Sequence, residues 1–567
     1  MRRLIAAVVL TSVLVFGLSL PLALPAHAQS KTDKTQKAAP PSLASQRGVD
    51  AITSAQLKDY LSFIASDEME GRDTPSRGLD TTAKFLGMNL SRWGFKPAGD
   101  EGSYFQKIGL SRDLVDKTET RVQLNDQILA FGTDYIPTAR PADLPATPLV
   151  FAGNGWFIKS KNIDAYNGID AKGKIAVIFG PANGYPTGVK SSDLSGRRGE
   201  DWMNVAEYAQ KQGVAAIVLV PDFQYLANWD RNRTRVTERG FIKVDKFQLP
   251  AGAQIPQLVV SLHLAEFLFQ DERQTAQSIF ESIYAGTTPQ PFALNPDKKL
   301  SITVKVKSDQ TTTQNVVGVF EGSDPVLKNE YVALGAHYDH VGIGIPVNGD
   351  AIYNGADDDG SGTTALLAMA EALGKARVRP KRSILFVWHA GEEKGLWGSR
   401  YFTSYPTLPL VKIVAQINID MIGRSKKDGD TNPRNQDLSG PNEIYVIGSK
   451  MMSTELGELV AGVNKQYMNL SYDYRYDDPS DPNRFFFRSD HYNYARKGIP
   501  IVFFFDGEHE DYHKPGDSVD KIDFQKMENV ARTIYVTLWE LANRPTRPIV
   551  DKRLPQQLQF QIQERSP

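Results

Sequence analysis

The chain has 567 residues, more than one domain usually holds, so two or three folded units are expected. Its 65 Lys and Arg residues nearly balance 66 Asp and Glu residues, and a net charge of −1 excludes a general attraction to nucleic acid or to an anionic membrane surface. The chain contains no cysteine, which excludes disulfides and thiolate ligands, so any metal has to be held by His, Asp or Glu.

The N-terminus has the pattern of an export signal. Two arginines precede an apolar run over 4–24, and Ala26-His27-Ala28 supplies a cleavage pattern of small residues. We expect a signal peptide over 1–28 that is cleaved, which gives a periplasmic or secreted protein without stable membrane insertion. The alternative is an uncleaved anchor, because the run approaches the roughly 20 residues that span a bilayer.

The following segments are expected to lead into an α/β domain. Residues 29–48 are polar and without period, as in a flexible leader. Apolar residues at helical spacing predict one helix that begins near Ser54 and another over about 79–93, with a polar loop at 66–78 between them.

Residues 138–285 are expected to form an inserted domain with its own small core. The runs 173–180, 213–220 and 255–261 are typical of buried strands, and 201–212 is typical of a helix. This range gathers no set of potential metal ligands.

From residue 315 onward, strands alternate with helices. The expected strands are 315–322, 331–340, 383–391, 413–423 and 498–507, and the helices between and after them are 361–374, 393–402, 451–467 and 523–543. Such alternation predicts an α/β fold with a mostly parallel central sheet and helices on both faces. Residues 546–567 are expected to be a loose tail.

Acids and a histidine follow several of these strands at Gly-rich turns. They are His337, Asp339, Asp357, Asp358, Asp359, Glu392, Glu393 and Asp420. Because carboxylates gathered at one rim repel one another, a cation is expected among them, and a histidine in the set favours a transition metal. Taken singly, each motif has another interpretation. The ADDDGSG turn is also typical of a calcium loop, and Glu392-Glu393 could be solvated acids in the first turn of a helix, where they interact favourably with the helix dipole.

Taken together and in order, these motifs resemble the M28 family of co-catalytic zinc peptidases. The matching positions are His337-x-Asp339, Asp358 ahead of the GSG turn, the Glu392-Glu393 pair, Asp420 in NIDMIG and His513 in DYHKPGD. The resemblance covers about 49–137 and 286–545. The insert resembles a protease-associated (PA) domain, which is expected to cap the cleft or to bind a partner.

The resemblance implies two zinc ions per chain. Asp358 would bridge them, His337 and Asp420 would complete one site, and Glu393 and His513 the other. A bridging carboxylate offsets the repulsion between two cations about 3.5–4 Å apart.

The resemblance also implies roles for neighbouring side chains. Glu392 would be the general base, taking a proton from the attacking water and delivering it to the leaving amine. Asp339 would fix the tautomer of the His337 ring, and Asp517 would do the same for His513. Tyr512 would donate a hydrogen bond to the developing oxyanion, with a packed aromatic ring as the alternative.

Other residues are expected near the substrate. Arg488 lies in a segment that lines the cleft in the resembling family, and Phe505 is expected to form part of a side-chain pocket. His340 is expected to be a structural or loop histidine, and His491 and His509 are not expected to be ligands.

These features predict an exported di-zinc exopeptidase, with an aminopeptidase acting on peptides favoured. A carboxypeptidase or a glutaminyl cyclase of the same fold remains open, and so does a non-catalytic binding protein. A cyclase works with one zinc, and a carboxypeptidase needs a cationic clamp for the substrate carboxylate.

Overall fold

The computed structural model describes residues 47–181, 184–190, 193–248, 255–287, 289–478 and 480–553. The expected export signal at 1–28 lies outside the described residues, as do most of the leader and of the tail. Among the residues placed, no helix combines the length and the apolar composition needed to cross a membrane.

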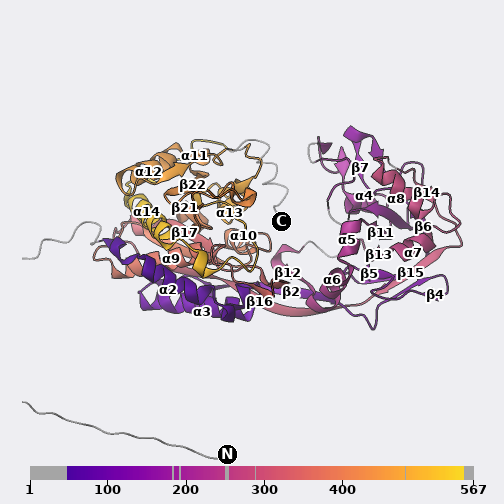
Figure 1. Cartoon of the computed structure of the whole chain (residues 1–567), viewed down its shortest axis with the longest axis horizontal. Helices are drawn as coiled ribbons and strands as arrows, with labels where there is room; N and C mark the ends of the chain where they lie inside the picture. The colour runs from indigo at the N-terminus through magenta and orange to yellow at the C-terminus, as the bar shows by residue number, and fades with distance from the viewer. Residues whose placement is uncertain are drawn as a thin grey trace, which may run out of the picture. The chain divides into compact units, whose positions relative to one another are not determined.

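A mixed sheet, ten-stranded within the described part of the chain, positions the site (Figure 1). Its order is β12-β2-β16-β20-β17-β21-β24-β22-β23, and β1 pairs with β16. The strands are β1 (Lys96–Pro97), β2 (Phe105–Val115), β12 (Phe241–Val244), β16 (Val306–Phe320), β17 (Tyr331–His337), β20 (Ser383–His389), β21 (Ile413–Ile419), β22 (Glu443–Ile447), β23 (Ser471–Asp473) and β24 (Ile501–Phe505). The four central strands β20, β17, β21 and β24 are parallel, which brings their carboxyl ends to one edge.

Helices cover both faces of this sheet. One apolar core includes side chains of α2 (Ser54–Ile64), α3 (Arg77–Arg92), α9 (Gly360–Lys375), α12 (Thr454–Gln466) and α14 (Phe524–Asn543). The core on the other face includes side chains of α10 (Trp397–Ser404), α11 (Ser449–Met452) and α13 (His491–Ala495). Strands β20 and β21 are buried along their whole length, as expected of strands that are covered on both faces. The predicted α/β class with helices on both faces is confirmed; the sheet is parallel at its centre and mixed toward its edges.

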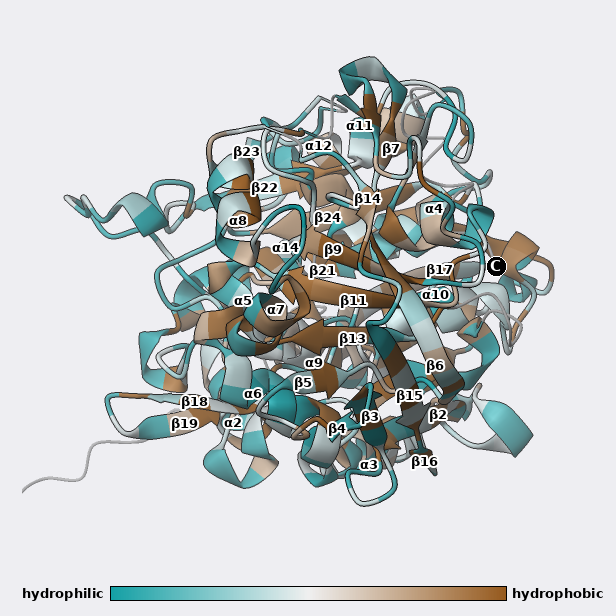
Figure 2. Ribbon diagram, turned by 90° about the vertical axis from the view of Figure 1, so that its right-hand side faces the viewer, coloured by the Kyte–Doolittle hydropathy of each residue, from teal (hydrophilic) through white to brown (hydrophobic). Residues whose placement is uncertain are grey.

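A second sheet, nine-stranded among the described residues, has the order β4-β3-β15-β6-β9-β11-β13-β5, with β14 paired to β6. Its strands are β3 (Arg121–Leu124), β4 (Gln127–Ile128), β5 (Tyr135–Pro137), β6 (Ala142–Phe151), β9 (Ile175–Gly180), β11 (Ala216–Pro221), β13 (Gln257–Val260), β14 (Phe292–Ala293) and β15 (Lys299–Val304). Figure 2 shows hydrophobic residues concentrated on β9, β11 and β13. The helices α7 (Leu262–Leu268) and α8 (Ala276–Tyr284) supply apolar side chains to the same core.

The second sheet does not coincide with the range 138–285 expected for the insert. Strands β3, β4 and β5 precede that range and β14 and β15 follow it, because side chains such as Val122 and Ile302 belong to the second core. Strand β12 lies within the range but pairs with β2 of the first sheet. The unit built around the second sheet therefore begins earlier and ends later than the sequence pattern indicated.

Candidate metal centre

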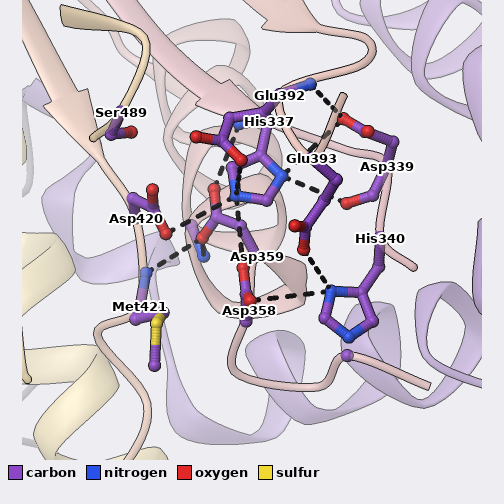
Figure 3. A network of polar contacts seen from close by, with 12 residues as sticks. His337, Asp339, His340, Asp358, Asp359, Glu392, Glu393, Asp420, Met421 and Ser489 are labelled. Atoms are coloured by element: carbon purple, nitrogen blue, oxygen red, sulfur yellow. Dashed lines mark hydrogen bonds and ion pairs between the residues drawn. The ribbon is translucent and has the colours of Figure 1, made fainter. Parts of the chain in front are cut away.

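The histidines and acids singled out in the sequence converge at the carboxyl edge of the parallel strands (Figure 3). His337 ends β17, Glu392 and Glu393 follow β20, and Asp420 follows β21. Asp358 precedes α9, and His513 lies in the loop after β24. Loops at the carboxyl ends of parallel strands are the usual ligand sites of α/β sheets, because chains diverge there and leave room.

Asp358 lies between two imidazoles. Its Oδ1 is 3.2 Å from His337 Nε2, and its Oδ2 is 3.0 Å from His513 Nε2. His337 Nε2 is also 3.5 Å from Asp420 Oδ1, and His513 Nε2 is 3.1 Å from Glu393 Oε2. The structure thus places these five residues in two imidazole–carboxylate groups that share one aspartate.

His340 joins the second group, which the sequence analysis did not anticipate. Its Nδ1 lies 2.9 Å from Glu393 Oε1 and 3.7 Å from Asp358 Oδ2, and the side chain is fully buried. His340, Asp358 and Glu393 bring potential ligand atoms within 4.8 Å of one another, as His337, Asp358 and Asp420 also do. Its place three residues after His337 at a strand end was the available signal. His513, with 37% of its side chain exposed, lies nearer the surface than His340.

The pKa values of the acidic groups diverge. Burial raises the pKa of Glu392 well above its usual range, and the charges of Glu393 and Asp420 add to the effect. Burial by itself would raise the pKa of Asp358. The nearby imidazoles of His340, His337 and His513 outweigh this effect and hold the pKa of Asp358 well below its usual range.

The pKa values of the two imidazoles are both raised. Burial lowers the pKa of His513, but the carboxylates of Asp358 and Glu393 beside its ring outweigh that effect and raise the pKa to about 10. Burial likewise lowers the pKa of His337, and Asp420 and Glu392 raise it well above its usual range. The neighbouring carboxylates therefore favour the protonated form of both imidazoles.

The donor set fits bound zinc. Asp358 Oδ2, Glu393 Oε1 and His513 Nε2 are buried and have no hydrogen-bond partner among the described residues. One imidazole nitrogen together with oxygens from two carboxylates is an ordinary set of zinc ligands. A divalent cation in each group would satisfy these atoms and offset the repulsion among the acids.

His337 is oriented by its own loop. Its Nδ1 lies 3.1 Å from the backbone carbonyl of Asp339, whereas the Asp339 carboxylate is 3.7 Å away. The backbone carbonyl is the nearer acceptor, and the role of the Asp339 side chain in fixing the tautomer stays a prediction. The carboxylate instead accepts a hydrogen bond from the backbone N–H of Glu392 at 3.1 Å. Burial raises the pKa of Asp339 to about 7.

Asp517 supports the turn that carries the shared aspartate. Its carboxylate accepts hydrogen bonds from the backbone N–H groups of Asp357 at 3.0 Å and of Asp358 at 3.1 Å. Two adjacent N–H groups form an anion-binding concavity, which explains why the carboxylate lies there. The expected role of Asp517 toward the His513 ring stays a prediction.

The flanking acid Asp359 fixes backbone on the other side of the turn. Its Oδ1 accepts from Gly362 N in the first turn of α9 and from Met421 N, and its Oδ2 accepts from His337 N. Asp359 therefore ties the segments of His337, Asp420 and α9 together.

A pocket opens beside Glu392 and Asp420. Its apolar lining residues are Met421, Phe485, Phe503 and Phe505, and its polar ones include Arg488, Glu508 and Tyr512. The structure therefore brings three further predicted residues, Arg488, Phe505 and Tyr512, to the site.

Two of these residues are held by neighbours. The Tyr512 ring stacks on the His513 ring with centroids 4.0 Å apart. Burial raises the pKa of Tyr512, and the charges of Asp358 and Glu393 add to this, so the hydroxyl keeps its proton. Arg488 forms an ion pair with Glu508 at 2.5 Å and lies over the Phe485 ring.

The sheet order and the acids and histidines at its strand ends define an α/β fold of the zinc-exopeptidase type. Residues 315–538 match the model of Peptidase family M28, and this segment of the chain is a domain of that family.

Curated relatives match part of the chain. A "Probable zinc metalloprotease" of Pyrenophora teres f. teres is 31% identical over 250 residues, covering 41% of this chain and 49% of that protein. A "probable leucine aminopeptidase 2" of Aspergillus oryzae is 38% identical over 144 residues, covering 24% and 26% of the two chains. The chain spans about half the length of the zinc metalloproteases it matches.

The fold extends further than the family domain. A solved aminopeptidase from Aneurinibacillus sp. strain AM-1 is similar over 90% of this chain and 98% of its own, with a TM-score of 0.51 and 16% identity. The similarity in fold therefore extends beyond residues 315–538.

Proposed function

We propose that this protein is an exported di-zinc aminopeptidase that releases N-terminal residues from peptides. The observation that carries the proposal is the position of Asp358, with one carboxylate oxygen near His337 and the other near His513. A single carboxylate facing two separate imidazole groups is the arrangement that two adjacent cations require. The M28 domain and the zinc metalloprotease and aminopeptidase relatives support the same reaction class.

Five residues would hold the metal. His337, Asp358 and Asp420 would hold one ion, and Asp358, Glu393 and His513 the other, with His340 as a further donor near the second. When bound, a zinc pair supplies an acidified water and polarises a carbonyl oxygen.

The side chains around the metal groups supply the remaining chemistry. Glu392 lines the pocket and is proposed to accept the proton of the attacking water and to pass it to the leaving amine. Tyr512 is proposed to donate a hydrogen bond from its hydroxyl to the oxygen on which negative charge develops. The apolar lining by Phe503, Phe505 and Met421 favours a hydrophobic side chain at the substrate's terminal residue.

The direction of cleavage follows from the charges in the pocket. A carboxypeptidase would need a free cation for the terminal carboxylate, but the guanidinium of Arg488 is already paired with Glu508. Four acids (Asp358, Glu392, Asp420 and Glu508) and one arginine line the same pocket, and this excess of negative charge favours the ammonium group of a free N-terminus over a carboxylate.

The test is hydrolysis of a short peptide in free, N-acetylated and C-amidated forms, with zinc content measured on the same sample. We expect cleavage that requires the free amine, tolerates amidation and accompanies two zinc ions per chain. Cleavage blocked by amidation would establish a carboxypeptidase instead. One zinc with cyclisation of N-terminal glutamine would establish the cyclase, and a zinc-loaded protein without turnover would favour the binding protein.

Export and the nature of the second domain belong to the same proposal. We propose cleavage after Ala28, which N-terminal sequencing of the mature protein tests directly. The unit around the second sheet is proposed to be PA-like, and to cap the cleft or bind a partner.

A further inference from the structure

Arg72 is a fully buried cation beside the metal-binding loops. Its side chain has no exposed surface. Its Nε donates to the carbonyl of Tyr338 at 3.0 Å, and its Nη2 donates to the carbonyl of Gly355 at 2.9 Å. Its Nη1 donates to the carbonyls of Ile64 and Asn354, each at 2.7 Å. All four acceptors are backbone oxygens, so the guanidinium acts as a connector between chain segments.

The segments that Arg72 joins bear the ligands of the proposed site. Tyr338 lies between His337 and Asp339, and Gly355 opens the turn that contains Asp358. Ile64 is the last residue of α2, so the guanidinium also ties both loops to a packed helix. Only a planar fork of N–H groups can serve several acceptors in fixed directions, which is why lysine is not equivalent to arginine here.

The backbone around Arg72 is fixed as firmly as its side chain. Arg72 has a positive φ of 48°, which is unusual for a residue with a Cβ. Its carbonyl accepts a hydrogen bond from His340 N at 3.1 Å. Gly71 precedes it, also with positive φ, and a Cβ there would lie 2.5 Å from the Tyr353 carbonyl. The turn at Gly71 and Arg72 therefore packs in direct contact with the loops that contain His340 and Tyr353.

The positive charge of Arg72 also stabilises the cluster of acids. Burial lowers its pKa to about 10, while the carboxylates of Asp339, Asp358, Asp359 and Asp517 oppose that change, so the group stays protonated at neutral pH. A fixed positive charge near these acids reduces their mutual repulsion when no metal is bound.

We infer that Arg72 is a positioning residue that holds the segments of His337 and Asp358 in the metal-binding arrangement before zinc arrives. This inference rests on the proposed di-zinc site. Residues that orient metal ligands typically change affinity by about 10–100-fold when they are replaced.

The test compares zinc affinity in Arg72→Lys and Arg72→Met with that of the wild-type full chain, by competition with a chromophoric chelator at fixed pH. Arg382→Lys is the matched control. Arg382 is 1% exposed, pairs with Glu330 at 2.8 Å, and immediately precedes β20, at the opposite end of the sheet from the site. Circular dichroism and thermal unfolding of the metal-free proteins measure how much secondary structure and how much thermal stability each substitution removes.

We expect both Arg72 variants to bind zinc at least about 10-fold more weakly than wild type, and Arg382→Lys to lose stability at unchanged affinity. Folded Arg72 variants with wild-type affinity would overturn the inference. So would Arg72 variants that stay unfolded at saturating zinc while Arg382→Lys folds, because Arg72 would then be required by the fold alone. A wild-type protein that binds no zinc would instead refute the proposed function.

Discussion

The carboxylates of Glu392 and Glu393 are adjacent in the chain but face different histidines. Glu392 Oε2 lies 4.0 Å from His337 Nε2, whereas Glu393 Oε2 lies 3.1 Å from His513 Nε2. One peptide unit therefore delivers a carboxylate to each of the two groups around Asp358. The pair offers two isosteric substitutions with opposite expected consequences.

Glu392→Gln is expected to keep the zinc content of wild type and to lower kcat by about 10²–10⁴-fold, the usual contribution of a general base. Glu393→Gln is expected to lose about one zinc equivalent per chain, because it removes a charged ligand. Metal analysis and steady-state kinetics on both variants check this. Equal zinc loss in the two variants would contradict the separation of base and ligand.

Zinc is expected to stabilise the folded chain through Asp358. Removing metal with a chelator should lower the thermal midpoint, and zinc at about 100 times its Kd should restore about 2.7 kcal/mol per site. Asp358→Asn removes the charge common to both groups and is expected to abolish the zinc-dependent shift. A variant whose midpoint still rises with zinc as in wild type would show that Asp358 is not a shared ligand.

Phe505 is expected to determine side-chain preference. Phe503 and Phe505 line the pocket, whereas Phe504, pointing to the other face of β24, packs in the opposite core. Phe505→Ala should lower kcat/KM for peptides with a large apolar N-terminal residue by about 10-fold, measured relative to peptides that begin with alanine. Phe504→Leu is the control, since it perturbs packing without touching the pocket. Equal changes for both substrate types would argue against a specificity role.

His491 is expected to make stability depend on pH. Burial lowers its pKa to about 3, although a hydrogen bond from its Nε2 to the Phe486 carbonyl and the charge of Asp490 oppose the change. The unfolded chain binds the proton near pH 6.5, so the stability is fully present above that pH. It is lost progressively as the pH falls from 6.5 to about 3, by on the order of 5 kcal/mol in total.

His491→Gln keeps a donor for the Phe486 carbonyl but does not titrate. The variant should be less stable than wild type at pH 7.5, because it loses the stacking on Phe503, and the difference should shrink as the pH falls. Urea unfolding of both proteins between pH 7.5 and 4.5 measures this. A difference that stays constant across the range would show that His491 does not titrate as described.

Sequence patterns predicted the α/β class, since buried hydrophobic runs ending in acids and Gly-rich turns are local features. Together with the family resemblance, they also singled out Glu392 and the acids and histidines of the two groups, with the exception of His340. The same patterns did not predict that the second sheet includes β3 and β15 from outside the range 138–285, because these are short alternating strands whose partners lie far away in the chain. Strand pairing over such distances leaves no local signal.

The sequence by itself determined which residue types reach the strand ends, because hydrophobic runs and turns are encoded by near neighbours. Only the tertiary structure decided what each of these residues contacts. Arg72, in a loop whose sequence indicated nothing but polarity, reaches carbonyls of Tyr338 and Gly355 from far along the chain. Asp517 supports the turn at Asp358, and His340 faces Glu393. A buried polar group goes where unpaired donors or acceptors remain, and that depends on the packing of the whole domain.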